Sequence, residues 1–168
     1  MEEYLDVLDE KGEKTGEIRT SSDVHLLGLW HRSVHIWFLN SKGELLLQKR
    51  SRRMKAFPLY WDISSAGHIS AGQSSIEAAK RETEEELGIF LLPNDLKFLF
   101  IIKQKVVINE GTFLENAFSD VYLVYSDLTL KDFKLQESEV EDIRWISQEY
   151  LKKWVNGQGE SLTPNPNN

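Results

Sequence analysis

The first fifty residues alternate between apolar and polar positions in two places. The segment "YLDVLDEKGEKTGEIR" carries short alternating runs and includes Gly12 and Gly16, which predicts a strand, a turn and a second strand. In "SVHIWFLNSKGELLLQKR", Val34, Ile36 and Phe38 alternate with their neighbours ahead of the turn sequence "NSKG". A period of two predicts a hairpin, and its strands are apolar enough to be buried on both faces.

The rest of the chain adds weaker strand patterns. Apolar runs within residues 96–111 and 115–126 predict two or three strands, and "IRWI" predicts a short late strand. Residues 51–67 have no regular period and predict a loop. Hairpins combined with two helices indicate an α/β fold in which the helices pack on a mixed sheet.

The C-terminal part predicts a helix and then a tail. Ser147 is suited to cap a short helix in "SQEYLKKWV". The polar segment 157–168 predicts a disordered tail. We therefore expect a single domain over residues 1–156.

The segment "GHISAGQSSIEAAKRETEEELGI" predicts the principal helix. Ser74 followed by Glu77 fits a capping box, and Gly88 fits a left-handed stop, so we expect the helix over residues 75–87. At about 100° per residue, one stripe of this helix is expected to face the core: Ile76, Ala79, Thr83 and Leu87.

The glutamates of this helix fall into two groups. Glu77 and Glu84 lie beside Lys80 and Arg81, which predicts a solvated face with i,i+4 pairs between Glu77 and Arg81 and between Lys80 and Glu84.

The second group is Glu82, Glu85 and Glu86, in a sector that no basic residue of the helix is expected to face. Carboxylates gathered in this way repel one another, and a divalent cation would relieve the repulsion. Oxygen ligands favour Mg²⁺ or Mn²⁺ over zinc. A purely solvated acidic helix is the alternative.

Composition narrows the class of partner. The net charge of −7 argues against duplex nucleic acid. The chain has no cysteine, which excludes disulfides and thiolate chemistry within it. The acidic start "MEEYLDVLDE" does not resemble a signal peptide, and no apolar run is long enough to span a membrane. We expect a cytoplasmic location.

The spacing from Gly67 onward resembles a known motif. It is G-x5-Q-x7-R-E-T-x-E-E-x-G-I, which is similar to the Nudix box G-x5-E-x7-R-E-U-x-E-E-x-G-U, where U is a bulky aliphatic residue. The departures are Gln73 and Thr83. Gln73 leaves two alternatives, a tolerated loop substitution and a weakened or repurposed site.

Resemblance to the MutT-like Nudix hydrolase family implies a fold and an activity. The fold is an α/β/α sandwich around a mixed sheet, here with an extra N-terminal hairpin. The activity is hydrolysis of a nucleoside diphosphate linked to another group, or of a similar small diphosphate, with Mg²⁺ or Mn²⁺. The implied metal ligands are Glu82, Glu85, Glu86 and the backbone carbonyl of Gly67, and Arg81 would hold a box glutamate in place. A homodimer is compatible with this resemblance.

The upstream sequence resembles a branch of that family that includes type I isopentenyl-diphosphate isomerases. Three histidines fall near the metal-binding histidines of that isomerase: His25, His31 and His68. Ala66 stands where the isomerase needs a cysteine, and Ala117 stands where it needs a second glutamate after Glu115. This favours a hydrolase, with an isomerase-like protein and a non-catalytic ligand-binding module as the alternatives. Purely structural roles for His25 and His31 also remain open.

Five residues outside the specified positions of the box are candidates for the site. Arg50 lies in the basic segment "QKRSRRMK" and could contact phosphate, although a solvated loop is the alternative. His68 is expected near substrate or metal. Trp61 could stack on a ring of the substrate or pack in the core. Glu139 is a candidate general base or extra metal ligand, and Glu115 is the other.

Overall fold

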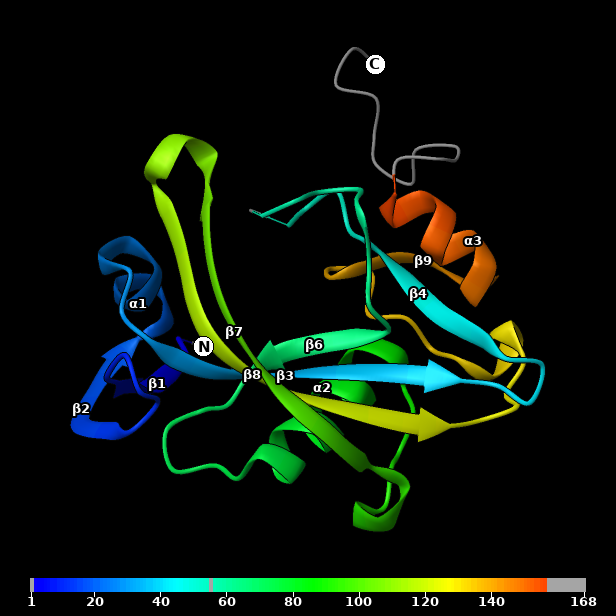
Figure 1. Ribbon diagram of the computed structural model, residues 1–168, viewed down its shortest axis with the longest axis horizontal. Coiled ribbons are helices and arrows are strands. Elements are labelled where there is room, and N and C mark those ends of the chain that lie inside the picture. The colour runs from blue at the N-terminus through cyan, green and yellow to red at the C-terminus, as the bar shows by residue number, and fades with distance from the viewer. Residues whose placement is uncertain (1, 55, 157–168) are drawn as a thin grey trace.

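The computed structural model describes residues 2–54 and 56–156 (Figure 1). Its helices and strands follow in chain order: β1 (Tyr4–Leu8), β2 (Lys14–Thr20), α1 (Ser21–Leu27), β3 (His31–Leu39), β4 (Glu44–Arg50), β5 (Trp61–Asp62), β6 (Ser65–His68), α2 (Ser75–Leu87), β7 (Lys97–Ile108), β8 (Phe113–Tyr125), β9 (Val140–Ser147) and α3 (Gln148–Val155). The predicted tail, residues 157–168, lies outside the described residues. No helix in the described part of the chain is long and apolar enough to cross a membrane.

Within the described residues, the central sheet is mixed and has seven strands. Its main path runs β5-β4-β3-β8-β7, with β6 paired to β3 and β9 paired to β4. The pair β3–β8 is parallel over its whole length, and the other pairs are antiparallel. The predicted hairpin of β3 and β4 is present, but the two strands pair only at Leu39 and Leu45. They then diverge, because β3 continues against β6 and β8 while β4 continues against β5 and β9.

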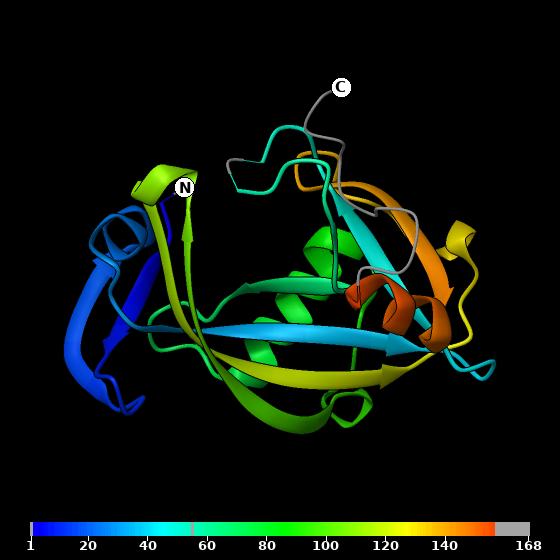
Figure 2. The ribbon, with the colours of Figure 1, turned by 45° about the horizontal axis from the view of Figure 1, so that its top comes forward.

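Helices cover both faces of the sheet, as Figure 2 shows. On one face α2 covers a core whose largest buried members include Ile36, Phe38 and Leu46. On the other face α3 packs its apolar side on Leu47 and Ile146. The alternation along β3 and β4 sends successive side chains to opposite faces. The predicted α/β/α sandwich around a mixed sheet is confirmed.

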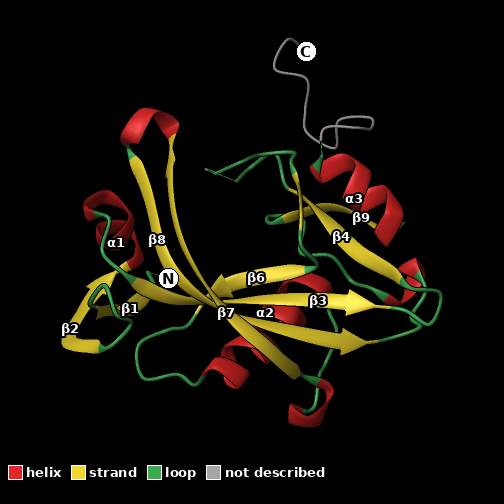
Figure 3. Ribbon diagram, in the orientation of Figure 1, coloured by secondary structure: helices red, strands yellow, loops and turns green. Residues whose placement is uncertain are grey.

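The N-terminal hairpin is a separate two-stranded sheet, β1 and β2, beside α1 (Figure 3). Bridges from Leu5 to Ser70 and from Leu8 to Trp30 attach it to the main body. Helix α1 was not predicted. Its signals are brief: Thr20 caps the N-terminus, and Gly28 ends the helix with a φ of 63°.

Two predictions of strand extent were wrong. Residues 51–67, where a loop was expected, contain β5 and most of β6, because each strand is too short to show a period of its own. Strand β9 extends well beyond "IRWI" because its pairing with β4 continues as far as Arg50. The expected helix after Ser147 is confirmed as α3, and the side chain of Ser147 accepts a hydrogen bond from the backbone N–H of Tyr150.

Candidate metal and active site

Helix α2 begins and ends where the sequence predicts. Ser74 accepts a hydrogen bond from the backbone N–H of Glu77, and the Glu77 carboxylate accepts one from the backbone N–H of Ser74. Gly88 ends the helix with a φ of 69°, and a Cβ there would lie 2.7 Å from the Cβ of Lys134. Both backbone conformation and space therefore require glycine at this position.

The buried side of α2 differs from the predicted stripe. Thr83 and Leu87 are fully buried as expected, but Ile76 is 39% exposed. The buried residues of the helix are Ala78, Ala79, Glu82, Thr83, Glu86 and Leu87. The prediction for Ile76 was wrong because the helix turns two glutamates toward β6, which rotates the buried sector away from Ile76.

Glu82 and Glu86 are buried carboxylates, only 8% and 4% exposed. Burial raises the pKa of Glu82 to about 8, and Arg81 opposes this rise. Burial also raises the pKa of Glu86 to about 7, and Glu139 adds to this rise by repulsion. Carboxylates in this environment favour a bound proton or a bound cation. Their oxygen chemistry and the exposed Glu85 beside them suit Mg²⁺ or Mn²⁺.

The carboxylate of Glu86 is held by the sheet. Its Oε2 accepts hydrogen bonds from the backbone N–H of Ala66 at 3.2 Å and from Nε2 of Gln48 at 3.4 Å. Gln48 is 1% exposed, and its Oε1 is a buried atom with no hydrogen-bond partner among the described residues. Gln48 was not predicted from the sequence as a site residue, although an amide directly after three leucines of one strand is a usable signal.

The approach of Glu82 to β6 leaves no room for a side chain at Gly67. A Cβ on Gly67 would lie 2.0 Å from Cδ of Glu82 and 2.1 Å from its Oε1. The backbone of Gly67 and the carboxylate of Glu82 are therefore directly adjacent, as a metal site shared between them would require.

Arg81 gathers the acidic side chains around it. Its Nη1 lies 2.7 Å from Oε1 of Glu82 and 3.3 Å from Oε2 of Glu85, and its Nη2 donates to the carbonyl of His68 at 2.9 Å. The prediction that no basic residue of the helix faces these glutamates was wrong, because the long guanidinium side chain reaches back across the helix surface. The geometry agrees with Arg81 holding a box glutamate in place.

The two predicted i,i+4 ion pairs do not form among the described residues. Glu77 is used in the capping box, and Arg81 turns to the other glutamates. The ammonium group of Lys80 lies 5.4 Å from the ring centroid of Phe90 instead of on Glu84. Glu77 and Glu84 are nevertheless exposed, as expected.

Gln73, which stands where the box has a glutamate, accepts two hydrogen bonds through its side chain. Its Oε1 accepts hydrogen bonds from the backbone N–H of Ser70 at 3.3 Å and from Nη2 of Arg81 at 3.4 Å. Thr83, the other departure, is fully buried and donates its hydroxyl to the carbonyl of Ala79 at 2.8 Å. The substitution at Gln73 therefore removes a charge while the loop stays tied to the helix.

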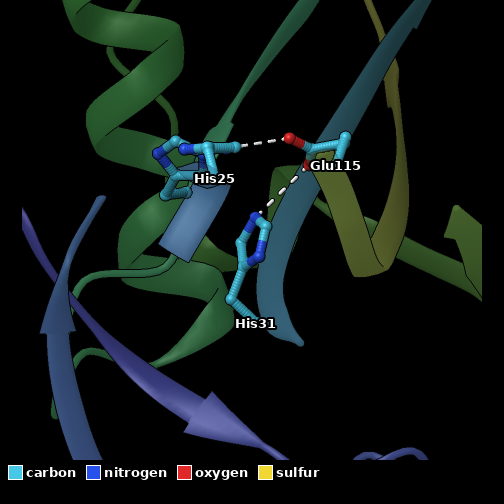
Figure 4. Close-up of side chains that lie close together, drawn as sticks. His25, His31 and Glu115 are labelled. Carbon is cyan, nitrogen blue, oxygen red and sulfur yellow. Dashed lines mark hydrogen bonds and ion pairs between the residues drawn. The ribbon is translucent and has the colours of Figure 1, made fainter. Parts of the chain in front are cut away.

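A second group of metal-ligand side chains adjoins the first, and we call it the histidine cluster. It consists of His25, His31, His68 and Glu115, and each offers one ligand atom within 4.8 Å of the others. Figure 4 shows His25 and His31 reaching the Glu115 carboxylate from two sides. The ring of Phe113 stacks on His25 with centroids 4.2 Å apart.

Hydrogen bonds fix how the two buried histidines face Glu115. Nδ1 of His25 lies 2.6 Å from the carbonyl of Ser21, and Nδ1 of His31 lies 3.3 Å from that of Leu29. Since a carbonyl only accepts, we assign the ring proton to Nδ1 in both. The Nε2 atoms, 2.9 and 3.3 Å from the Glu115 carboxylate, then direct lone pairs at an anion. A divalent cation resolves this arrangement, as does protonation of the rings.

The carboxylate of Glu115 is stabilised in its ionised form when these rings carry a proton on Nε2. Burial alone would raise its pKa, but when the rings of His25 and His31 are protonated, their hydrogen bonds and charge hold the pKa well below its ordinary value. An ionised carboxylate beside two imidazole nitrogens is a suitable ligand set for Mn²⁺ or another divalent metal.

Glu3 connects the histidine cluster to the helix. Its Oε2 lies 3.0 Å from Nδ1 of His68, and its Oε1 accepts from the Ser70 hydroxyl at 2.8 Å and lies 3.7 Å from Nη2 of Arg81. Because Arg81 contacts Glu82, polar contacts run continuously from one group to the other. Glu3 was not predicted from the sequence as a site residue, since one acidic residue near the N-terminus carries no pattern.

The other predicted residues have varied surroundings. Arg50 donates from Nε to the carbonyl of Ala56 at 3.0 Å and pairs with Asp62 at 3.4 Å, so its guanidinium braces the loop before β5. Trp61 packs beneath α3 and carries Arg144 over its ring at 5.0 Å. The phosphate and ring-stacking roles of Arg50 and Trp61 stay predictions.

Two more titratable groups lie nearby. Glu139 acts on Glu86 through repulsion, and its carbonyl accepts a hydrogen bond from the backbone N–H of Ser51 at 2.7 Å. His35, which the sequence analysis did not single out, pairs in register with Ala66. Burial lowers the pKa of His35, which leaves a neutral imidazole on the strand that also carries His31.

A mixed sheet between two helices, with one capped helix turning carboxylates onto a glycine of the sheet, defines the Nudix class of α/β domains. Residues 29–164 match the family model described as the NUDIX domain. The chain belongs to the Nudix hydrolase family.

Relatives and solved structures agree with this assignment. The chain is 42% identical to Nudix hydrolase 3 of Arabidopsis thaliana over 97% of its length, and 35% identical to an uncharacterized Nudix hydrolase of Listeria monocytogenes, covering 90% of this chain and 83% of that one. It is also 28% identical to the isopentenyl-diphosphate Delta-isomerase of Escherichia coli, over 96% of this chain and 86% of that one. A crystal structure from Deinococcus radiodurans superposes with a TM-score of 0.69 at 26% identity, covering 94% and 91% of the two chains. The chain spans only 22% of the length of the Arabidopsis relative.

Replacing Gly67 with alanine is expected to weaken metal binding at the box glutamates more than tenfold. The new Cβ would collide with the Glu82 carboxylate, so that carboxylate must leave its position. Mn²⁺ titration followed by electron paramagnetic resonance would measure the loss, with circular dichroism as a check on folding. Unchanged Mn²⁺ affinity in a folded variant would contradict the placement of the ion.

The metal-free protein is expected to lose stability as the pH rises from about 5 to about 8.5. Glu82 and Glu86 have folded pKa values of about 8 and about 7 against an ordinary value of 4.5. The folded state therefore binds more protons than the unfolded state between about pH 5 and about pH 8.5. The free energy of unfolding falls as the pH rises through the folded pKa values of Glu86 and Glu82.

Thermal unfolding in EDTA would measure this dependence, and Glu82→Gln should flatten the fall in Tm. Exposed Glu84→Gln is the matched control and should keep the wild-type slope. Equal slopes in wild type and Glu82→Gln would mean that Glu82 titrates normally.

Replacing Glu3 with alanine is expected to weaken Co²⁺ binding at the histidine cluster by about tenfold. The Glu3 carboxylate fixes the ring of His68 through Nδ1 and leaves the other ring nitrogen available to an ion. The visible absorption of bound Co²⁺ would report affinity and geometry. The neighbouring Glu2→Ala, at an exposed position, should bind as wild type does, and an equal loss in both variants would contradict a specific role for Glu3.

Proposed function

We propose that this domain hydrolyses the pyrophosphate linkage of a small diphosphate, a nucleoside diphosphate joined to another group or a similar molecule, with Mg²⁺ or Mn²⁺. The observation that carries the proposal is the pair of buried carboxylates on α2, Glu82 and Glu86. The carboxylate of Glu85, on the same helix, is exposed. Buried carboxylates that lack a full complement of cationic partners destabilise a fold, so a bound cation offers a physical reason for their position.

The chemistry of the substrate supports the same assignment. A pyrophosphate carries several negative charges, which repel an attacking nucleophile. A divalent ion would neutralise phosphate oxygens and lower the pKa of a bound water. Glu82, Glu85, Glu86 and the carbonyl of Gly67 are the ligands expected to hold it, and Glu85 is the exposed one of the three carboxylates.

Each remaining side chain has a role that follows from its contacts. Glu85 is exposed and is the carboxylate best placed to accept a proton from the attacking water. Arg81 orients Glu82 and Glu85 through its two short contacts. Glu139, which acts on Glu86 electrostatically, is a second candidate base, and His68 and Arg50 are candidates for substrate contact.

The histidine cluster favours one alternative, an isopentenyl-diphosphate isomerase activity, which the name of the Escherichia coli relative also suggests. Against it, Ala66 and Ala117 present methyl groups where that reaction would need an acid and a base. Ala66 pairs in register with His35, and Ala117 pairs with His31. Hydrolysis needs neither of the two missing groups, so we favour it.

Composition bears on the kind of substrate and on the location of the protein. A net charge of −7 suits a small metal-bound substrate rather than duplex nucleic acid. The absence of cysteine agrees with a cytoplasmic location, which forms part of the proposal.

Glu85→Gln is expected to lower the turnover of the best substrate by about 10²- to 10⁴-fold, the usual contribution of a general base. Phosphate release from a panel of diphosphates, with and without Mg²⁺ or Mn²⁺, would identify that substrate and measure the loss. The adjacent exposed Glu84→Gln is the matched control and should retain wild-type turnover.

Three outcomes would count against the proposal. Equal metal-dependent rates in wild type and Glu85→Gln would overturn the role of Glu85. Conversion of isopentenyl to dimethylallyl diphosphate would establish the isomerase alternative. Binding of a diphosphate without turnover across the panel would favour a ligand-binding module.

A further inference from the structure

Gln48 is a polar side chain in an apolar part of the sheet. It directly follows three leucines on β4 and is 1% exposed. Its register partner on β9 is Ile143, a member of the main core cluster. Burying an amide costs free energy unless its donors and acceptors are satisfied. If packing alone decided this position, an aliphatic side chain would therefore suit it better.

The amide of Gln48 is satisfied at only one of its two ends. Its Nε2 donates to Oε2 of Glu86 at 3.4 Å, whereas its Oε1 is buried and accepts no hydrogen bond within the described part of the chain. Folded proteins leave few buried polar atoms unpaired, and a water or an ion is a common partner for those that remain. The donor for Oε1 therefore has to come from outside the described residues.

Ser65 carries a second atom of the same kind. It is fully buried, and its hydroxyl oxygen has no hydrogen-bond partner among the described residues. Ser65 directly precedes Ala66 on β6, and the backbone N–H of Ala66 donates to Oε2 of Glu86 at 3.2 Å. Strands β4 and β6 thus each give Glu86 one N–H donor, and each also holds an unpaired polar atom beside that donor.

The direction of these hydrogen bonds matches a metal ligand. Both N–H groups bind Oε2 of Glu86, so the other carboxylate oxygen remains available to a cation. If the Gln48 amide were turned around, its oxygen would face Oε2, and two acceptors repel unless the carboxyl group carries a proton. The observed orientation therefore stabilises the ionised carboxylate, which is the form that binds a metal.

We propose that Gln48 is a positioning residue for the cation at the box glutamates: its Nε2 fixes Glu86, and its Oε1, together with the Ser65 hydroxyl, binds water molecules of that ion. Mg²⁺ usually keeps several waters when it binds a protein, and these waters supply the donor that Oε1 lacks. The inference rests on the proposed function, because it concerns the same cation.

Two variants separate a positioning role from a structural one. Gln48→Met keeps a side chain of similar length but removes both hydrogen-bonding ends. It should weaken Mn²⁺ binding at the box glutamates by about 10- to 100-fold. The Tm of the metal-free variant should stay at or above the wild-type value, because the variant no longer buries an unpaired oxygen.

Ser51→Ala is the matched control. Ser51 is also 1% exposed and lies three residues further along the chain, but its hydroxyl donates to the carbonyl of Glu137 at 3.0 Å. Its replacement should lower Tm and leave Mn²⁺ affinity unchanged, the reverse of Gln48→Met. Pulsed electron paramagnetic resonance identifies the ion that is measured, because Mn²⁺ at the histidine cluster would show coupling to imidazole nitrogen and Mn²⁺ on oxygen ligands would not.

Nuclear magnetic resonance of the wild type gives a test that needs no substitution. The side-chain amide signal of Gln48 should shift when Mg²⁺ is added, and that of Gln148, which is exposed on α3, should not.

Three results would overturn the proposal: equal Mn²⁺ affinity in wild type and Gln48→Met, a Gln48 amide signal that does not move as Mg²⁺ binds, or a loss of Tm in metal-free Gln48→Met as large as that in Ser51→Ala. A wild type that binds Mn²⁺ on oxygen ligands, with these effects of Gln48, yet hydrolyses no diphosphate would count against the proposed function alone.

Discussion

The burial of two carboxylates of α2 against β6 is the constraint on which the rest of the site depends. Glu82 reaches the backbone of Gly67 so closely that no side chain fits there, and Glu86 is held by the backbone of Ala66 and the amide of Gln48. Removing charge from water is costly unless it is compensated. The capped start of the helix and the guanidinium of Arg81 therefore work with the sheet to keep an acidic cluster where a cation can balance it.

Polar contacts connect the histidine cluster to the box glutamates. Strand β6 contributes to both groups, because His68 belongs to the histidine cluster and Gly67 lies against Glu82. Glu3 and Arg81 form a second connection, since Glu3 contacts His68 and Arg81, and Arg81 contacts Glu82. The N-terminal segment thus contributes to the site, because Glu3 lies directly before β1.

The predictions from the sequence that succeeded rest on local patterns. The hairpin of β3 and β4, the long strands β7 and β8, and both ends of α2 follow from local patterns, because alternation, capping and a left-handed glycine act within a few residues. Helix α1 and the strands β5 and β6 were missed because they are too short to show a period. Ile76 was wrongly predicted to be buried because the rotation of a helix about its axis depends on which side chains pack against the sheet. Here two of those side chains are glutamates, Glu82 and Glu86.

The sequence by itself determined the family, the bounds of the main helix and the identity of the box carboxylates, since these rest on spacing along one segment. Tertiary structure alone decided which carboxylates are buried, that Arg81 faces them, and that Gln73 keeps its connections without a charge. It also decided that His25, His31 and Glu115, far apart in the sequence, meet around one point. Contacts of this kind depend on strand pairing and on the packing of the hairpin, and no local pattern encodes them.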